Sequence, residues 1–245
     1  MKKHEHVIII PARYKSSRFP GKPLVAINGK SMIERVWQRC CMAIDQSFVF
    51  VATDDLRIAE HCQEKGIQVI MTPDSCLTGT DRLFEASKHI DAVTYINVQG
   101  DEPLLDPQDI TDVITQAKLK PDDIVNGMCE IELETDFRSP NVPKVVVRPD
   151  GRLLYMSRAA IPTSKKFEFK SAYKQVCIYA FPKKSLEDFT AVKEKTPLEK
   201  IEDIEILRFL ELGYEVSMLK VSSASIAVDV PEDVARVERA LNETD

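Results

Sequence analysis

The 245-residue sequence has few glycines, few histidines and no long apolar run. No stretch approaches the ~20 apolar residues that span a bilayer, and residues 1–6 lack the apolar core of a signal peptide, so we expect a cytosolic protein that does not enter the membrane. The six cysteines form no CxxC pair and there are only four histidines, which argues against a zinc site. In a reducing compartment we expect these cysteines to stay free.

Basic residues are also in the minority. There are 33 Lys and Arg against 39 Asp and Glu, a formal charge of −6, and this argues against a nucleic-acid-binding protein because such proteins need a basic surface to displace counterions. Hydrophobic residues make up 44% of the chain, enough for a sizeable core, and we find no repeat, low-complexity tract or linker. We therefore expect a single domain over residues 1–245.

Apolar and amphipathic segments alternate through the first half of the chain. Residues 7–12 form an apolar, β-branched run typical of a strand that is buried on both faces. The next helix begins after Ser31, which we expect to form a capping box with Glu34. Further strands are predicted at 48–52, 68–71, 93–98 and 124–128, and further helices at 56–65, 80–90 and 107–119. The alternation predicts parallel strands with right-handed crossovers, and such a sheet binds ligands at the carboxyl ends of its strands.

The second half of the chain begins differently. Residues 143–181 are predicted to be rich in β-structure, with a hairpin formed by 144–148 and 153–156 around a Pro-Asp-Gly turn. The segments predicted after it are a helix at 197–212, a strand at 214–221, a short apolar run at 226–228 and a final helix after Pro231. The chain is expected to end as it began, in α/β structure.

The loop after the first strand concentrates positive charge. Four residues between positions 13 and 22 are basic, and Arg13, Arg18 and Lys22 could together neutralise a polyphosphate. The alternative is a solvated charged loop, which we regard as the weaker interpretation because the loop lies at the ligand end of its strand. The loop matches neither the Walker pattern nor the GxGxxG fingerprint, so it is not an ordinary P-loop or dinucleotide-binding turn.

Two acidic residues at the ends of apolar runs could hold a divalent cation. Asp101 follows a predicted strand and Asp229 follows the last short apolar run. Mg²⁺ favours one or two carboxylates together with phosphate oxygens, although an Asp in the position of Asp229 is also a common helix N-cap. Residues 78–82, TGTDR, contain a glycine that permits close backbone approach, but Thr80 and Asp81 could equally cap the helix that follows.

These segments belong to a larger set of motifs. In chain order the set consists of IPARYKSSRFPGKPL (10–24), ATDD (52–55), TGTDR (78–82), NVQGDEP (97–103), SRAAIP (157–162), IYAF (178–181), LEKIEDIEILRFLELG (198–213) and VDVPEDV (228–234). This set closely resembles the CMP-Kdo synthetases, the 3-deoxy-manno-octulosonate cytidylyltransferases. The resemblance covers nearly the whole chain in the family order, and the combination is far more specific than any single motif.

The resemblance implies both a fold and a reaction. The fold is α/β, of the nucleotide-diphospho-sugar transferase type, with a Rossmann-like, mostly parallel twisted sheet and a β-rich dimerisation insertion near 143–181. The reaction is the transfer of CMP from CTP to the anomeric hydroxyl of a 3-deoxy-2-ulosonic acid, with release of pyrophosphate. The resemblance also implies a Mg²⁺-dependent homodimer that supplies lipopolysaccharide or capsule assembly.

The resemblance also implies roles for particular residues. The residues implied to contact the CTP phosphates are Arg13, Ser17 and Lys22. Those implied to surround the cytosine and ribose are Ala12, Thr80 and Gln99, with Asp81 and Arg82 close by. The implied Mg²⁺ ligands are Asp101 and Asp229, and the residues implied to border the sugar are Arg158, Gln175, Tyr179 and Glu205. Arg13, Lys22 and Asp101 are implied to be catalytic, because attack on the α-phosphorus is accelerated mainly by positioning and charge neutralisation.

The chain departs from the family pattern mainly where the family faces the sugar. Cys76 stands where the family usually has a histidine, Gln175-Val176-Cys177 where it has His-Ile-Gly, Ile206 where it has a glutamine and Val230 where it has a threonine. Because lost polar partners change which hydroxyls a site accepts, we hypothesise Kdo or a variant such as 8-amino-Kdo as the acceptor. The alternatives are a CTP-dependent enzyme for another acidic acceptor, a sialic-acid-like sugar or a phosphonate, and a catalytically silent nucleotide-binding protein.

Overall fold

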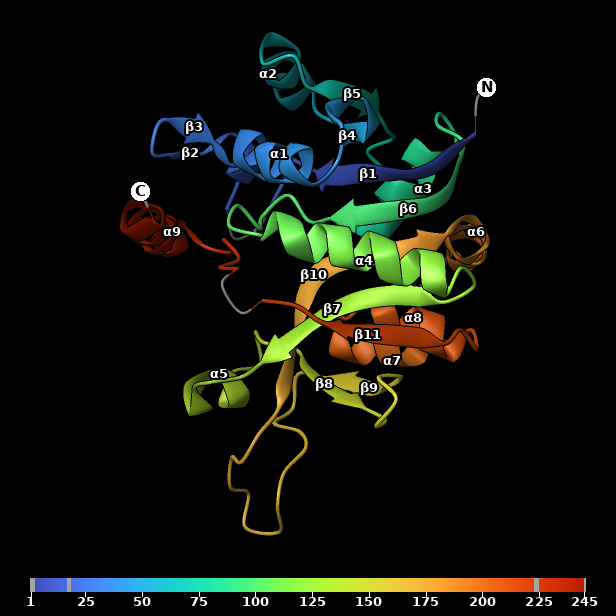
Figure 1. The fold of residues 1–245 in the computed structure, drawn as a ribbon, viewed down its shortest axis with the longest axis vertical. Helices are drawn as coiled ribbons and strands as arrows, with labels where there is room; N and C mark the ends of the chain where they lie inside the picture. Colours follow the sequence, from blue (N-terminus) through green and yellow to red (C-terminus); the bar gives the residue numbers. More distant parts are fainter. Residues whose placement is uncertain (1–2, 17–18, 223–224, 245) are drawn as a thin grey trace.

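The computed structural model of the protein describes residues 3–16, 19–222 and 225–244. Its centre is a nine-stranded sheet whose main path runs in the order β11-β7-β10-β6-β1-β4-β5 (Figure 1). The strands are β1 (His4–Ala12), β4 (Val49–Thr53), β5 (Gln68–Met71), β6 (Ala92–Val98), β7 (Ile124–Glu130), β8 (Lys144–Val147), β9 (Leu153–Ser157), β10 (Tyr173–Pro182) and β11 (Val216–Lys220). The strands predicted in the first half of the chain and the predicted hairpin are therefore confirmed, with bounds that shift by a few residues.

The main path of the sheet is parallel, as predicted, except at β10. β1 pairs in parallel with β4 and β6, β4 with β5, and β7 with β11. β10 lies antiparallel between β6 and β7 and also pairs with β8 of the hairpin. The β-rich segment is thus more than a peripheral insertion, because its last strand, β10, is itself a strand of the central sheet and pairs with β6 (Figure 1).

Helices cover both faces of the sheet. They are α1 (Met32–Ala43), α2 (Leu56–Glu64), α3 (Gly79–Ser87), α4 (Pro107–Leu119), α5 (Glu134–Arg138), α6 (Lys183–Ala191), α7 (Pro197–Glu202), α8 (Ile206–Glu211) and α9 (Pro231–Thr244). Because successive strand residues point to opposite faces, Ile8 and Ile10 pack in one core with α1, α2 and α4, while Val7 and Ile9 pack in another with α3, α6 and α8. Among the described residues, no helix is long and apolar enough to cross a membrane.

The start of α1 confirms half of the predicted capping box. Ser31 Oγ accepts a hydrogen bond from the Glu34 N–H at 3.2 Å. The predicted return contact is wrong, because the Glu34 carboxylate accepts from Gln38 and pairs with Lys65 instead.

One prediction for the last third of the chain is also wrong. The helix predicted at 197–212 is broken into α7 and α8, because Asp203 between them adopts a positive φ of 52°, which is incompatible with a right-handed helix. The short apolar run at 226–228 forms no helix or strand, and its Val228 N–H donates to the Asp101 carbonyl at 2.9 Å.

The final helix returns to the beginning of the chain. α9 lies next to the hairpin of β2 (Ala26–Ile27) and β3 (Lys30–Ser31) in Figure 1. Val237 of α9 packs in one cluster with Ile27, Met32 and Val228, and the Asn28 N–H donates to Glu238 at 3.0 Å. These contacts fix the segment before α9 close to the loop that follows β1.

Candidate active site

The loops that follow β1 and β6 border a cavity of about 440 Å³, within the range of small-molecule sites. The start of α3, the turn between α7 and α8 and the segment before α9 complete its wall. The predicted site residues that line it are Ala12, Arg13, Lys22, Arg82, Gln99, Asp101, Glu205 and Asp229. The structure therefore brings these residues together at the carboxyl ends of parallel strands, where such a sheet binds ligands.

Lys22 lies between two carboxylates in this cavity. Its Nζ is 2.8 Å from Asp101 Oδ2 and 3.8 Å from Asp229 Oδ1, and it donates to the Val228 carbonyl at 2.8 Å. The bond from the Val228 N–H to the Asp101 carbonyl ties the two acidic segments together. The ammonium thus occupies a position between two carboxylate oxygens that would also attract a divalent cation.

Two glycines let the backbone approach closely at this site. A Cβ on Gly100 would lie 2.9 Å from the Pro11 carbonyl oxygen, closer than such atoms come in proteins. A Cβ on Gly79 would lie 3.0 Å from Gln99 Nε2, so the start of α3 leaves room for the Gln99 amide. The two glycines therefore permit the close backbone approach that places Asp101 and Gln99 at the cavity.

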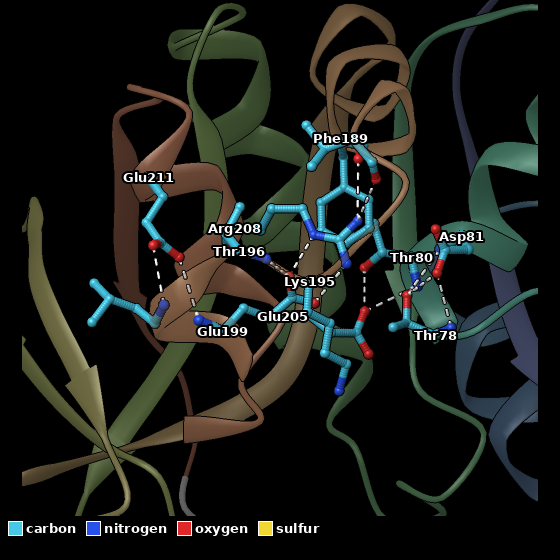
Figure 2. A network of polar contacts seen from close by, with 12 residues as sticks. Thr78, Thr80, Asp81, Phe189, Lys195, Thr196, Glu199, Glu205, Arg208 and Glu211 are labelled. Atoms are coloured by element: carbon cyan, nitrogen blue, oxygen red, sulfur yellow. Dashed lines mark hydrogen bonds and ion pairs between the residues drawn. The ribbon is translucent and has the colours of Figure 1, made fainter. Parts of the chain in front are cut away.

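Glu205 reaches the cavity from the turn before α8. Its Oε2 accepts hydrogen bonds from the Thr80 N–H at 3.1 Å and the Thr80 hydroxyl at 2.5 Å (Figure 2). Burial raises the pKa of Glu205, and the bonds from Thr80 oppose that rise. Asp81 forms a capping box with Thr78 at the start of α3. Asp81 therefore caps the helix, whereas Thr80 connects that helix to Glu205.

A buried ion pair supports the helices behind Glu205. Arg208 Nε and Nη2 donate to the two Glu199 carboxylate oxygens at 2.6 and 2.7 Å (Figure 2). The guanidinium carbon lies 3.7 Å from the centroid of the Phe189 ring, and Glu199 also completes a capping box with Thr196 at the start of α7. The pair joins α6, α7 and α8, so the position of Glu205 depends on it.

Arg158, predicted to border the sugar, contacts the protein backbone. Its Nε donates to the Glu202 carbonyl at 2.5 Å, its Nη1 to the Pro140 carbonyl at 2.9 Å and its Nη2 to the Asp203 carbonyl at 3.0 Å. These bonds hold the turn between α7 and α8. Arg158 is not among the described residues that line the cavity, and its contact with the sugar stays a prediction.

Gln175 and Tyr179, on β10, also lie outside the lining that the described residues form. Gln175 Nε2 donates to Asn126 Oδ1 at 3.0 Å. Burial, followed by the neighbouring Cys177 thiol, raises the pKa of Tyr179 well above its usual value. The role of both side chains at the sugar stays a prediction.

Some residues of the cavity carry no clear sequence signal. Lys195 and Asp203 line it and form an ion pair with each other, but both fall in a stretch that looks helical or polar. The tolerance of Asp for a positive φ is the only local sign of the break at Asp203. Cys76, one of the departures from the family pattern, lines the cavity as well. Ser17 and Arg18 lie outside the described residues.

Comparison with known proteins places the chain among enzymes. A family model described as cytidylyltransferase matches residues 7–219. The chain belongs to the cytidylyltransferase family. Two relatives named 3-deoxy-manno-octulosonate cytidylyltransferase, from Syntrophotalea carbinolica and, as a mitochondrial protein, from Arabidopsis thaliana, are 41% and 40% identical to it; the matches cover 95% and 96% of this chain and 97% and 82% of theirs.

Other relatives of this cytidylyltransferase have different names or a known structure. An 8-amino-3,8-dideoxy-manno-octulosonate cytidylyltransferase from Shewanella halifaxensis is 38% identical, over 96% of this chain and 97% of its own. The solved structure of a CMP:2-keto-3-deoxy-manno-octonic acid synthetase in complex with CTP aligns with a TM-score of 0.91 at 34% identity, over 98% of this chain and 100% of the other. The resemblance drawn from the motifs is thereby confirmed.

Proposed function

We propose that this cytidylyltransferase transfers CMP from CTP to the anomeric hydroxyl of a 3-deoxy-2-ulosonic acid and releases pyrophosphate. The observation that carries the proposal is Lys22 between Asp101 and Asp229, in a cavity that also contains Arg13. Cationic groups suited to a polyphosphate thus lie beside carboxylates suited to a divalent cation. Relatives named for this reaction support the proposal over nearly the full chain.

The reaction depends on positioning and charge neutralisation more than on acid–base chemistry. The acceptor oxygen bonds to the α-phosphorus while the bond from that phosphorus to the bridging oxygen breaks, and the hydroxyl proton is released. Negative charge then builds up on the leaving pyrophosphate. Arg13 and Lys22 neutralise that charge, and Gln99 orients the nucleoside. Glu205, held by Thr80, accepts hydrogen bonds from the hydroxyls of the acceptor.

Asp101 and Asp229 fit the Mg²⁺ that the proposed reaction uses. Both carboxylates already reach one cationic group, the Lys22 ammonium. Among the described residues there is no cluster of three or more His, Cys, Asp and Glu that would hold a metal by itself, which suits an ion that takes its other ligands from phosphate oxygens and water. When bound, Mg²⁺ supplies further neutralisation of phosphate charge.

The acceptor that we propose is Kdo or an amino-deoxy variant of it. Cys76 lines the cavity, and Ile206 lies next to Glu205. Both stand where the family pattern has a polar side chain, so this site offers the acceptor fewer hydrogen-bond partners. Discrimination between hydroxylated and aminated sugars depends on such partners.

A pyrophosphate-release assay with CTP and Mg²⁺ tests the proposal. The acceptors are Kdo, 8-amino-Kdo, a sialic-acid-like sugar and a phosphonate, with a reaction lacking acceptor as the control for CTP hydrolysis. We expect turnover with an ulosonate and a CMP-ulosonate product by mass spectrometry. Preference for the sialic-acid-like sugar or the phosphonate would favour the alternative acceptor, and CTP binding without turnover of any acceptor would favour a catalytically silent protein.

We also propose that the enzyme works in the cytosol as a homodimer to which residues 143–181 contribute contacts. Leu154 and Phe167 in this segment have 55% and 69% of their surface exposed. A contact between subunits would cover these apolar side chains. The test is sedimentation of a Leu154→Ser/Phe167→Ser variant, which should shift toward the monomer; a wild-type protein that sediments as a monomer would contradict the proposal.

A further inference from the structure

β10 contains a β-bulge beside the cavity. Its pairing with β7 passes from Val176–Gly127 to Tyr179–Asn126, so residues 177 and 178 are extra on the β10 side. β-Bulges redirect side chains and are over-represented next to active sites. This bulge lies on the reversed strand, where β10 runs against the carboxyl end of β6.

The Asn126 side chain fills this bulge. Asn126 has 0% of its surface exposed, and its Nδ2 donates to the Val176 carbonyl at 3.0 Å and to the Ile178 carbonyl at 2.9 Å. Its Oδ1 accepts from Gln175 Nε2 at 3.0 Å, which sets the orientation of the amide. One side chain thus satisfies two carbonyls that the interrupted β-ladder would leave unpaired, a loss that is expensive in a buried place.

The residue after Asn126 is also suited to the bulge. A Cβ on Gly127 would lie 2.8 Å from Ile178 Cγ2 and 3.4 Å from Val176 Cβ. Any larger residue at this position would push the bulge away from β7. The pair Asn126-Gly127 therefore accommodates the bulge by shape and by hydrogen bonding together.

The bulge is tied directly to the loop that carries Asp101. The Gln99 N–H donates to the Cys177 carbonyl at 3.2 Å. The Glu102 N–H donates to the Gln99 carbonyl at 3.3 Å, and Glu102 has 4% of its surface exposed. The 99–102 loop thus closes on Gln99, the residue that is bonded to the bulge, and the loop places Gln99 and Asp101 at the cavity.

We propose that Asn126 is a positioning residue for the nucleotide and metal half of the site. Oriented by Gln175, it holds the bulge at 177–178, and the bulge holds the 99–102 loop. Gln175 thus acts through Asn126 rather than on the sugar. The inference rests on the proposed function only where the KM for the ulosonate is measured, in the test of Gln175 below.

The test compares Asn126→Leu, which keeps a similar volume and removes all three hydrogen bonds, with Ser217→Ala. Ser217 is a buried polar residue on the neighbouring strand β11, opposite Val125, and its hydroxyl donates to Asp123 rather than to a residue of the bulge. In Asn126→Leu we expect amide hydrogen exchange in residues 97–104 to accelerate roughly tenfold and CTP affinity in Mg²⁺, measured by calorimetry, to fall roughly tenfold. The control should lose thermal stability without either change.

An Asn126→Leu protein that loses stability as the control does, but keeps its exchange pattern and CTP affinity, would overturn the inference. If that variant does not fold, Asn126→Asp retains the shape, loses both donors and is compared in the same way. If the wild type turns over no ulosonate, the proposed function fails, while exchange and calorimetry still decide the role of Asn126.

Gln175→Leu separates the two roles of Gln175. We expect a smaller effect of the same kind in the wild type and no added effect in the Asn126→Leu background, because Gln175 acts through Asn126. An increase in KM for the ulosonate alone, equal in both backgrounds, would show that Gln175 contacts the sugar and would overturn that part of the inference.

Discussion

Replacing Glu199 by Gln tests whether the ion pair behind the acceptor side of the cavity stabilises the fold. The carboxylate of Glu199 and the guanidinium of Arg208 have 0% and 2% of their side-chain surface exposed, and two hydrogen bonds join them (Figure 2). Glu199→Gln keeps the shape of the side chain and leaves the Arg208 charge buried without its counter-ion. The carbonyls of Phe189 and Val192 still accept from Arg208 Nη1, but they carry no full charge.

The expected loss is large because one buried charge is left unpaired. Breaking such a pair typically costs about 3–5 kcal/mol, a substantial part of the roughly 5–15 kcal/mol that stabilises a protein. With an m-value of about 2 kcal/mol/M in urea, a loss of about 4 kcal/mol lowers the unfolding midpoint by roughly 2 M. Because replacing both charges leaves neither unpaired, the double variant Glu199→Leu/Arg208→Met should be more stable than Glu199→Gln.

The matched control is the exposed pair of Glu85 and Lys88 on α3. Their charged atoms are 2.7 Å apart, but 27% and 51% of their side-chain surface is exposed. Glu85→Gln should change stability by no more than about 0.5 kcal/mol. A urea midpoint that Glu199→Gln shifts no further than Glu85→Gln does, or a double variant as unstable as Glu199→Gln, would contradict a stabilising role for the ion pair.

Three further predictions concern the cavity itself. Asp101→Asn should abolish Mg²⁺-dependent turnover and leave the far-UV circular dichroism unchanged; activity that survives would contradict the assignment of Asp101 to the metal. Burial raises the pKa of Glu205 above 4.5, so its ionisation destabilises the fold as pH rises through the raised pKa. Glu205→Gln removes that effect, and its melting temperature relative to wild type should rise with pH; a constant difference would refute this. Gly100→Ala forces a Cβ against the Pro11 carbonyl, and a displacement of ~1 Å should lower kcat/KM about 100-fold; unchanged kinetics would refute it.

The parts of the fold that local pattern determines could be predicted from the sequence. Strands such as β4 and β5 are short apolar runs between amphipathic helices, and that alternation alone indicates a parallel sheet. The reversed direction of β10 could not be predicted, because the direction of a strand depends on which strands it pairs with in three dimensions. Nothing in residues 173–182 distinguishes a strand at the periphery from one between β6 and β7.

The candidate site likewise contains residues that the local sequence pattern locates and residues that only the folded chain brings there. Arg13, Lys22 and Asp101 lie in loops directly after predicted strands, so the end of the strand already indicates their location. Lys195 and Asp203 reach the cavity only because the chain turns between α7 and α8, and a single positive φ of 52° at Asp203 produces that turn. Because apolar residues have helical spacing on both sides of this turn, the sequence predicts one continuous helix instead of a turn.

The acceptor preference of the enzyme could change while its preference for CTP stays the same, because different parts of the chain form the two halves of the proposed site. The CTP half of the proposed site is built from the loops after β1 and β6 and the segment before α9, which Lys22 ties together. The acceptor half is built from other segments, such as those of Thr80 and Glu205, 125 residues apart. The turn that presents Glu205 is held from behind by Arg158 and by the Arg208–Glu199 pair. Residues that line the cavity but do not support this turn, such as Cys76, can therefore be exchanged without moving the catalytic loops, and we expect acceptor preference to vary there first.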